Sequence, residues 1–254
     1  MTEQPKNALV TGGAQRIGRA ISLALAGAGY GVCVHHHASA DAAQALVREI
    51  TAQGGRAEAV AADLSLEPET AQLIARAGAA IGPLDVLVNN AALFERDEVH
   101  TATRESWDRH MDVNLRAPFV LTQAFAGALA DGVTGNVVNI LDQRVRNLTP
   151  HFLSYTLSKA GLWTLTRTLA LALAPGVRVN GIAPGPVLPS PRQSEDAFQR
   201  QAEATPLGRA IDPEEVAKGV LFVLEAGSLT GQMIALDSGQ HLHWAAPGSP
   251  GIEE

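Results

Sequence analysis

Short apolar runs alternate with longer amphipathic stretches along the chain, and this alternation most restricts the possible fold. Seven runs predict strands, at 7–10, 31–34, 57–62, 84–88, 135–141, 176 to about 184, and 233–236. The stretches between them carry apolar residues at helical spacing, such as Ile17, Ile21 and Leu25. Strands joined through helices pair in parallel. The sequence therefore predicts a single α/β domain over residues 1–254, with a doubly wound seven-stranded parallel sheet and helices on both faces.

The charge balance argues against nucleic-acid binding. Nineteen Lys and Arg face 26 Asp and Glu, for a net charge of -7, whereas nucleic-acid-binding domains carry basic patches. No run reaches the ~18 apolar residues of a membrane span, and the first residues do not resemble a signal peptide. We expect a cytoplasmic protein whose partner is a small molecule, with no nucleic acid and no membrane.

A glycine-rich turn separates the first predicted strand from the first helix. It contains Gly12, Gly13 and Gly18, and a strand, glycine turn and helix in this order begin a dinucleotide-binding unit. Glycines let a pyrophosphate approach the backbone, and the helix start offers free N–H groups and the positive end of its dipole. We therefore predict a dinucleotide against this turn, with Gly12, Arg16, Ile17 and Gly18 in contact with it.

The end of the second predicted strand indicates which dinucleotide is bound. An acid near this point would bind the ribose 2′-hydroxyl of NAD, but residues 35–39 read HHHAS. Imidazoles, a hydroxyl and the arginine of the glycine turn suit a 2′-phosphate, so we expect NADPH, with His35, His37 and Ser39 near that phosphate. The histidines do not suit a metal site, because alternation along a strand turns His36 away from the other two.

The ends of the third and fourth predicted strands add further candidates. Asp63 and Leu64 close the third strand, while Asn90 and Ala91 follow the fourth. Ligands of open parallel sheets bind beyond such ends. Phe94 comes next, either as a core residue or as a wall for a flat substrate.

A proline interrupts the long helix predicted from residue 104 to about residue 131. Pro118 has no N–H, so the carbonyl of Asn114 loses its helical partner. That carbonyl is free to hold a water or a lysine; the alternative is an ordinary proline kink.

A tyrosine and a lysine four residues apart indicate acid–base chemistry. Tyr155 and Lys159 lie on one face of a predicted helix. A nearby ammonium favours the phenolate and lowers the pKa of a phenol from about 10, so that Tyr155 can transfer a proton. The same spacing also occurs on ordinary amphipathic helices. Asp142 stands at the end of the strand that precedes this helix.

The sixth predicted strand leads into the longest irregular region. Pro184 and Gly185 end the strand, and the region of about 186–212 begins with a segment rich in proline, glycine and serine up to Ser194, followed by a short polar helix around 195–203. A long segment at a strand's carboxyl end predicts a lid over the site.

Together these motifs resemble the short-chain dehydrogenase/reductase family over nearly the whole chain. The matching residues are Thr11, Gly12, Gly18, Asp63, Leu64, Asn89, Asn90, Ala91, Asn114, Tyr155, Lys159, Asn180, Pro184 and Gly185. The resemblance implies a Rossmann fold and hydride transfer from a nicotinamide. It implies that Tyr155 donates the proton, that Lys159 lowers its pKa and holds the nicotinamide ribose, and that the Asn114 main chain holds a water.

Asp142 departs from the family pattern, which has a serine thirteen residues before the tyrosine. A hydroxyl can donate to a ketone oxygen, whereas a carboxylate only accepts and would repel a developing oxyanion. A carboxylate suits a ring rich in N–H groups. The pteridine reductase branch, with the similar dihydromonapterin and dihydrofolate reductases, has this substitution. That resemblance implies a catalytic trio of Asp142, Tyr155 and Lys159, a pterin stacked on Phe94, and Arg16 at the 2′-phosphate.

Three functions are compatible with these residues. The first is NADPH-dependent reduction of a pterin-like ring, bound by Phe94, Asp142 and Tyr155. The second is a carbonyl or 3-oxoacyl reductase, in which Asp142 is protonated or only caps a turn. The third is a non-catalytic NADP(H)-sensing protein, which the presence of both Tyr155 and Lys159 disfavours. Members of the family are usually tetramers built through their long helices and last strand, so we expect a homotetramer.

Overall fold

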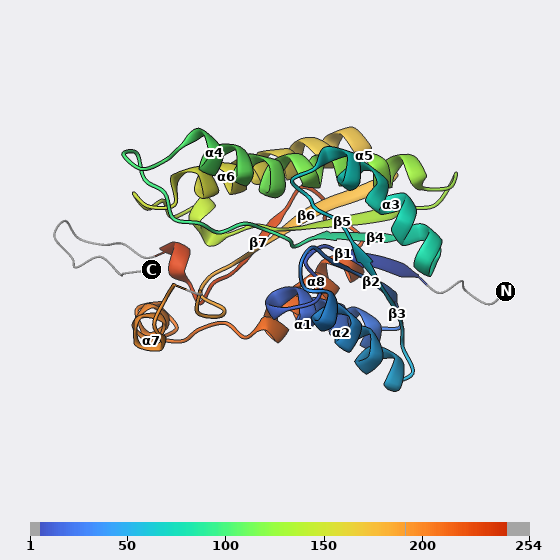
Figure 1. Ribbon diagram of the computed structural model, residues 1–254, viewed down its shortest axis with the longest axis horizontal. Helices are drawn as coiled ribbons and strands as arrows, with labels where there is room; N and C mark the ends of the chain where they lie inside the picture. The colour runs from blue at the N-terminus through green and yellow to red at the C-terminus, as the bar shows by residue number, and fades with distance from the viewer. Residues whose placement is uncertain (1–5, 191, 243–254) are drawn as a thin grey trace.

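Seven parallel strands form the sheet, in the order β3-β2-β1-β4-β5-β6-β7. The computed structural model describes residues 6–190 and 192–242 (Figure 1). The strands are β1 (Asn7–Val10), β2 (Gly31–His36), β3 (Arg56–Ala61), β4 (Val86–Asn89), β5 (Gly135–Ile140), β6 (Val177–Pro184) and β7 (Met233–Leu236). The predicted α/β fold class, a seven-stranded parallel Rossmann-like sheet, is confirmed.

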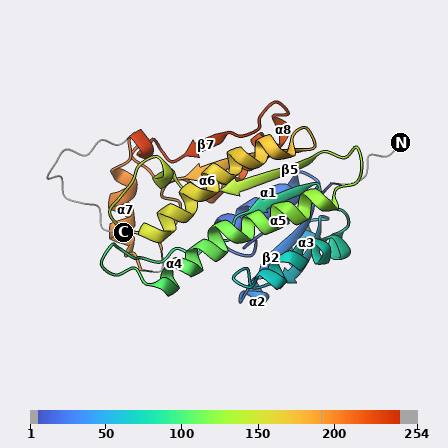
Figure 2. The same ribbon diagram turned by 90° about the horizontal axis from the view of Figure 1, so that it is seen from above.

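Helices cover both faces of the sheet (Figures 1 and 2). One face carries α1 (Arg16–Gly27), α2 (Ala40–Ala52) and α8 (Pro213–Glu225). The other carries α3 (Glu67–Ile81), α4 (Arg104–Met111), α5 (Ala117–Ala128) and α6 (Leu153–Leu173). The short helix α7 (Glu195–Glu203) lies at one end of the molecule, away from both layers.

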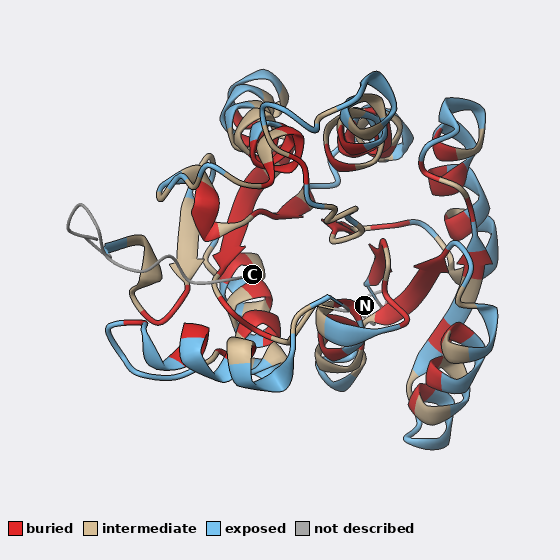
Figure 3. Cartoon of the chain, turned by 60° about the vertical axis from the view of Figure 1, so that its left-hand side comes forward, coloured by how far each residue is buried: buried red, intermediate tan, exposed pale blue. Residues whose placement is uncertain are grey.

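Alternating side chains of each strand supply two separate cores. Ala8 and Val10 of β1 pack under α1, whereas Leu9 between them packs toward α3 and α5. The same alternation recurs in β2 and β4, as the period of two in a strand requires. The inner strands are buried on both faces (Figure 3), which explains their continuous apolar sequences.

The long helix predicted from residue 104 to about residue 131 consists of three segments. A π-helical turn, η1 (Asp112–Arg116), separates α4 from α5, and α5 ends at Ala128. The sequence predicts one long helix interrupted by Pro118, and the structure shows the interruption as this π-helical turn just before the proline. Pro118 has no N–H to donate to the carbonyl four residues back, so regular α-helical bonding cannot continue past it. Such π turns are frequent at functional sites.

The sheet is extended first on one side of β1 and then on the other, so the strand order changes direction between β1 and β4. Strands β1 to β3 extend to one side, and the chain then returns to place β4 on the other side of β1. The crossover loops leave a crevice at this switch point, beyond the carboxyl ends of the strands. None of the helices within residues 6–190 and 192–242 is long and apolar enough to cross a membrane.

The glycine turn has almost no room for a side chain at Gly18. A Cβ there would lie 2.1 Å from the Gly12 carbonyl oxygen, whereas a Cβ on Gly27 at the end of α1 would meet no atom within 4 Å. We expect Gly18→Ala to lower the free energy of unfolding by ~1–3 kcal/mol in urea denaturation. The matched Gly27→Ala should be neutral or stabilising by up to ~1 kcal/mol. Equal effects of the two substitutions would contradict this close approach.

Candidate functional site

Two cavities open at the carboxyl edge of the sheet. The glycine-turn cavity, of about 650 Å³, extends over the ends of β1 to β4. The tyrosine cavity, of about 220 Å³, lies at the ends of β5 and β6. They share Arg16, Ile17, Asn90, Ala92 and Phe94. The glycine-turn cavity alone contains Gly12, Gly18, His35, His37, Ser39, Asp63, Leu64 and Ala91, and the tyrosine cavity alone contains Asp142, Tyr155, Lys159, Pro184 and Gly185.

The conformation of the glycine turn depends on Asn90. Its side-chain amide donates to the carbonyls of Thr11 and Gly12, at 2.8 and 3.1 Å. Thr11 Oγ1 in turn accepts the N–H groups of Asn90 and Ala91 at 2.9 and 3.0 Å. Gly12 and Arg16 both have left-handed backbone, with φ of 59° and 52°. The Asn90 side chain therefore holds the turn that forms the cavity wall.

His35 has a supporting role that its sequence position did not reveal. Its Nδ1 accepts the Gly12 N–H at 3.0 Å, and its Nε2 lies 3.1 Å from the Ala62 carbonyl, so Nε2 carries the hydrogen. Burial lowers the pKa of His35 to about 4. A neutral ring with both nitrogens bonded supplies no charge to a phosphate. His37 is exposed, with Nδ1 3.8 Å from Asp63, and it remains the imidazole available to an anion.

Asp142 contacts both the turn that follows it and Tyr155. Its Oδ1 accepts the Arg144 N–H at 2.8 Å, which caps the 3₁₀ turn η2 (Gln143–Val145). Its Oδ2 accepts the Tyr155 hydroxyl at 2.8 Å. The turn-capping alternative and the catalytic alternative therefore use different oxygens of one carboxylate.

The electrostatics at Tyr155 differ from the sequence expectation. Burial, followed by the Asp142 charge and its hydrogen bond, raises the pKa of Tyr155 well above 10. Lys159 donates to the Ile140 carbonyl at 2.7 Å, and its Nζ lies 5.9 Å from the Tyr155 ring centre. Burial lowers the pKa of Lys159 to about 8. Desolvation disfavours both charged forms, so Tyr155 is a protonated phenol in this arrangement.

Phe94 stands at the mouth of the tyrosine cavity. It stacks on Phe152 with ring centres 4.4 Å apart and planes at 7°. The Tyr155 ring meets it edge-on at 4.7 Å. Phe152 thus covers one face of Phe94, and only the opposite face can receive a flat substrate. The guanidinium groups of Arg144 and Arg192 each lie 5.8 Å from the Phe94 ring centre.

Asn114, the one predicted site residue outside both cavities, lies fully buried in η1. Its Oδ1 accepts the Leu93 N–H at 2.8 Å, and its Nδ2 donates to the Leu93 carbonyl at 2.9 Å and to Ser158 Oγ at 3.0 Å. The side chain therefore joins the loop before Phe94 to the helix of Tyr155 and Lys159.

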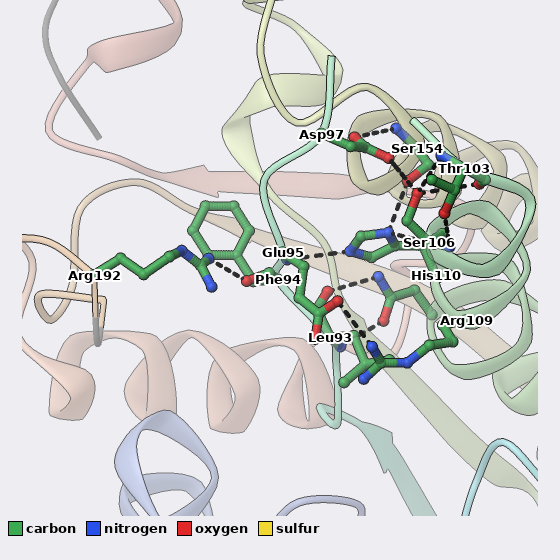
Figure 4. Close-up of polar contacts among 11 residues, drawn as sticks. Leu93, Phe94, Glu95, Asp97, Thr103, Ser106, Arg109, His110, Ser154 and Arg192 are labelled. Carbon is green, nitrogen blue, oxygen red and sulfur yellow. Dashed lines mark hydrogen bonds and ion pairs between the residues drawn. The ribbon is translucent and has the colours of Figure 1, made fainter. Parts of the chain in front are cut away.

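The segment predicted as a lid lies over the tyrosine cavity. Val187, Leu188 and Phe198 line it. The two ends of the segment are joined where the Ile211 N–H donates to the Pro186 carbonyl at 2.9 Å. Arg192 reaches across to the Phe94 carbonyl (Figure 4).

Comparison with known proteins agrees with this geometry. The family profile described as "Enoyl-(Acyl carrier protein) reductase" matches residues 12–241. The 3-oxoacyl-[acyl-carrier-protein] reductase of Staphylococcus epidermidis is 33% identical over 242 residues, covering 93% of this chain and 99% of that one.

The chain belongs to the short-chain dehydrogenase/reductase family.

Two solved structures of the family have a higher sequence identity to this chain. FolM alternative dihydrofolate reductase 1 from Brucella canis, complexed with NADP, is 49% identical with a TM-score of 0.93, and the match covers 96% of each chain. The Brucella suis protein, also in complex with NADP, has the same identity and TM-score over 95% of this chain and 97% of that one. A blue fluorescent protein from a metagenomic library, in complex with NADPH, is 32% identical with a TM-score of 0.86, over 92% of this chain and 97% of that one.

Several residues around the site were not found from the sequence. Phe152 and Arg192 approach Phe94 from distant parts of the chain, and no local pattern indicates this. Arg144 follows Asp142 closely but was not singled out. His110 stands four residues before Asn114, on the same helical face, and this spacing could have revealed it.

The buried neutral His35 should make the fold sensitive to acid. In the unfolded chain this histidine has a pKa near 6.5 and takes up a proton below that pH. In the folded protein it stays neutral until the pH approaches its pKa of about 4. The contribution of His35 to the free energy of unfolding is therefore fully present above about pH 6.5. It decreases as the pH falls toward 4, by up to on the order of 3 kcal/mol.

Urea denaturation across this pH range tests the expectation. His35→Asn, which keeps an acceptor near Gly12, should flatten the pH dependence of the free energy of unfolding. The exposed His100→Asn is the matched control and should leave the wild-type slope unchanged. Equal slopes in all three proteins would remove His35 as the cause.

Proposed function

We propose that this protein is an NADPH-dependent reductase of a pterin-like ring, such as a dihydropteridine, dihydromonapterin or dihydrofolate. The observation that carries the proposal is Asp142 in the tyrosine cavity, 2.8 Å from the Tyr155 hydroxyl. A carboxylate there can accept N–H groups of a heterocycle and cannot donate to a ketone. The names and NADP complexes of the 49% identical Brucella proteins support the same assignment.

The glycine-turn cavity fits NADPH. Its wall is a backbone turn in which a Cβ at Gly18 would collide with Gly12, as expected where a pyrophosphate approaches the main chain. Arg16, His37 and Ser39 all line this cavity, and we assign them to the 2′-phosphate. The end of β2 has no carboxylate that would repel it. Ala38 provides no charge there, so Arg16 and His37 would carry the preference for NADPH over NADH.

We assign the other predicted cofactor-binding residues to roles in the two cavities. Asp63, Leu64 and Ala91 would contact the adenosine portion, and Pro184 and Gly185 the nicotinamide end. Lys159 would hold the nicotinamide ribose.

The bound nicotinamide would supply the hydride, and the chain's own residues would manage the ring and the proton. The open face of Phe94 would receive the flat ring, and Asp142 would hold its N–H groups. Tyr155 would donate the proton, since its raised pKa keeps the phenol protonated. The Lys159 ammonium would stabilise the phenolate left behind. The Asn114 main chain would hold a water through which the proton is replaced.

A carbonyl or 3-oxoacyl reductase is the second candidate. It draws support from the turn-capping bond of Asp142 Oδ1 and from the 33% identical 3-oxoacyl-[acyl-carrier-protein] reductase. In this alternative Asp142 only shapes the turn, and its removal would leave ketone reduction intact.

A substrate panel with NADPH and NADH in parallel separates the candidates. We expect reduction of a dihydropterin or dihydrofolate with NADPH preferred. Asp142→Ser should lower kcat/KM for the pterin about 10- to 100-fold, the weight of a hydrogen bond to a charged group. Asp142→Asn, of the same shape, is the matched variant and should lose most of the activity too, because its NH₂ cannot accept. Reduction of simple ketones without any pterin turnover would refute the proposal.

We also propose that the protein is a homotetramer. An apolar groove of about 430 Å³ on α4, η1, α5 and α6 is lined by Met111, Leu115, Phe119 and Leu165, among others. It lies on the outer face of the helical layer, where the family's long helices meet their partners.

Light scattering tests the assembly. Leu165→Glu would place a charge in this groove and should reduce the tetramer to a dimer, because burying an unpaired charge is costly. Leu66→Glu, at a site 49% exposed outside the groove, is the control and should remain tetrameric. A wild-type monomer would contradict the proposed assembly.

A further inference from the structure

A buried polar cluster lies behind Phe94, outside both cavities (Figure 4). Asp97, His110 and Ser154 are 3%, 1% and 0% exposed. Ser154 Oγ donates to Asp97 Oδ2 and lies 2.7 Å from His110 Nδ1. The Glu95 N–H donates to His110 Nε2 at 3.2 Å. One imidazole thus joins the loop after β4 to the first turn of α6.

The bonds of the cluster are consistent with only one protonation state of His110. Glu95 N–H can only donate, so Nε2 must hold a lone pair. Nδ1 then carries the hydrogen, which faces the Ser106 carbonyl at 2.9 Å and Ser154 Oγ. Ser154 can accept it because its own hydrogen points to Asp97. An imidazolium would set an Nε2–H against the Glu95 N–H, two donors face to face. The ring is therefore neutral.

The cluster is not a hydrolytic triad, although it contains the same three residue types. Ser154 lies between the other two members and donates to the carboxylate, so the histidine does not act as its base. Its hydroxyl is also inaccessible to any substrate. The cluster can fix positions, and it cannot attack a ligand.

The loop that carries Phe94 has no regular structure of its own, since no helix or strand lies between Asn89 and Arg104. Side chains hold it at every second residue instead. Asn114 binds both backbone groups of Leu93, and His110 binds the N–H of Glu95. Asp97 receives the Ser154 N–H and hydroxyl. Anchoring residues 93, 95 and 97 therefore fixes the backbone on both sides of Phe94, which lines both cavities.

The other end of the cluster adjoins the proton donor. Ser154 immediately precedes Tyr155, and the His110 and Tyr155 rings are 6.1 Å apart. Phe94 immediately precedes Glu95, and the Phe94 and Tyr155 rings meet at 4.7 Å. Glu95 and Ser154 are the neighbours of Phe94 and Tyr155 in the chain. The His110 side chain, which bonds to both neighbours, therefore sets the distance between the two rings.

We propose that His110 is a positioning residue that fixes Phe94 through Glu95 and Tyr155 through Ser154. The inference rests on the proposed function for its consequence, namely that one arm of the imidazole governs substrate binding and the other governs proton transfer. Phe94 receives the ring and so affects KM. Tyr155 delivers the proton and so affects kcat.

Two substitutions test the two hydrogen bonds of His110, to Glu95 and to Ser154, separately. His110→Asn keeps a donor near the Nδ1 position and loses the bond to Glu95; we expect KM for the dihydropterin to rise about fivefold with kcat within about twofold, the usual weight of one hydrogen bond. His110→Gln keeps an acceptor near the Nε2 position and loses the bond to Ser154; kcat should fall about fivefold with KM within about twofold. NADPH affinity, measured directly by fluorescence, should stay within about twofold in both.

The matched control is Thr122→Val in α5. Thr122 is also fully buried and bonds only to the Pro118 carbonyl of its own helix among the described contacts. It should lower stability and leave both KM and kcat unchanged. Proportional losses of both constants in the two His110 variants, or the same split in Thr122→Val, would overturn the positioning role.

A measurement without turnover distinguishes failure of this inference from failure of the proposed function. Nitrogen-15 shifts of histidine-labelled protein near neutral pH should show His110 neutral with its hydrogen on Nδ1. An Nε2–H ring or an imidazolium overturns the inference whatever the substrate is. The expected tautomer in a protein that reduces no pterin refutes the proposed function alone. The separate effects of the two His110 substitutions on KM and kcat are then measured with the substrate that the panel identifies.

Discussion

The parallel direction of all seven strands is the constraint on which the site depends. Parallel ladders place every strand's carboxyl end at one edge, so residues at or just after the ends of β1 to β6 line the same two cavities. The backbone groups there have left the ladder and need other partners. Asn90, Thr11 and His35 supply them for the glycine turn. The polar residues at this edge therefore support one another as well as any ligand.

The burial of Tyr155 and Lys159 determines the acid–base state of the tyrosine cavity. Burial raises the pKa of Tyr155 and lowers that of Lys159, because removal from water penalises the phenolate and the ammonium alike. Asp142 acts in the same direction on Tyr155 and in the opposite direction on Lys159. The resulting neutral phenol is suited to giving a proton, which is the direction that reduction requires.

Local spacing was enough to single out candidate residues. Tyr155 and Lys159 were noted for their helical spacing and Asp142 for its place at a strand end, while their predicted roles came from the family resemblance. His35 shows the limit, since its position was right for the cavity but burial made it a neutral support of Gly12. Phe152 could not be found in this way, because it lies 58 residues after Phe94 in the chain and has a left-handed backbone conformation.

The sequence by itself determined the architecture, because the spacing of apolar residues along the chain shows the period of two of a strand and the period of 3.6 of a helix. It also determined the glycine turn and the line of residues at the strand ends. Tertiary structure alone decided which partner each polar atom meets: Asp142 between Arg144 and Tyr155, and His110 between Glu95 and Ser154. Those choices depend on burial and on contacts between distant segments. A charge or a tautomer is fixed only when water is replaced by particular neighbours.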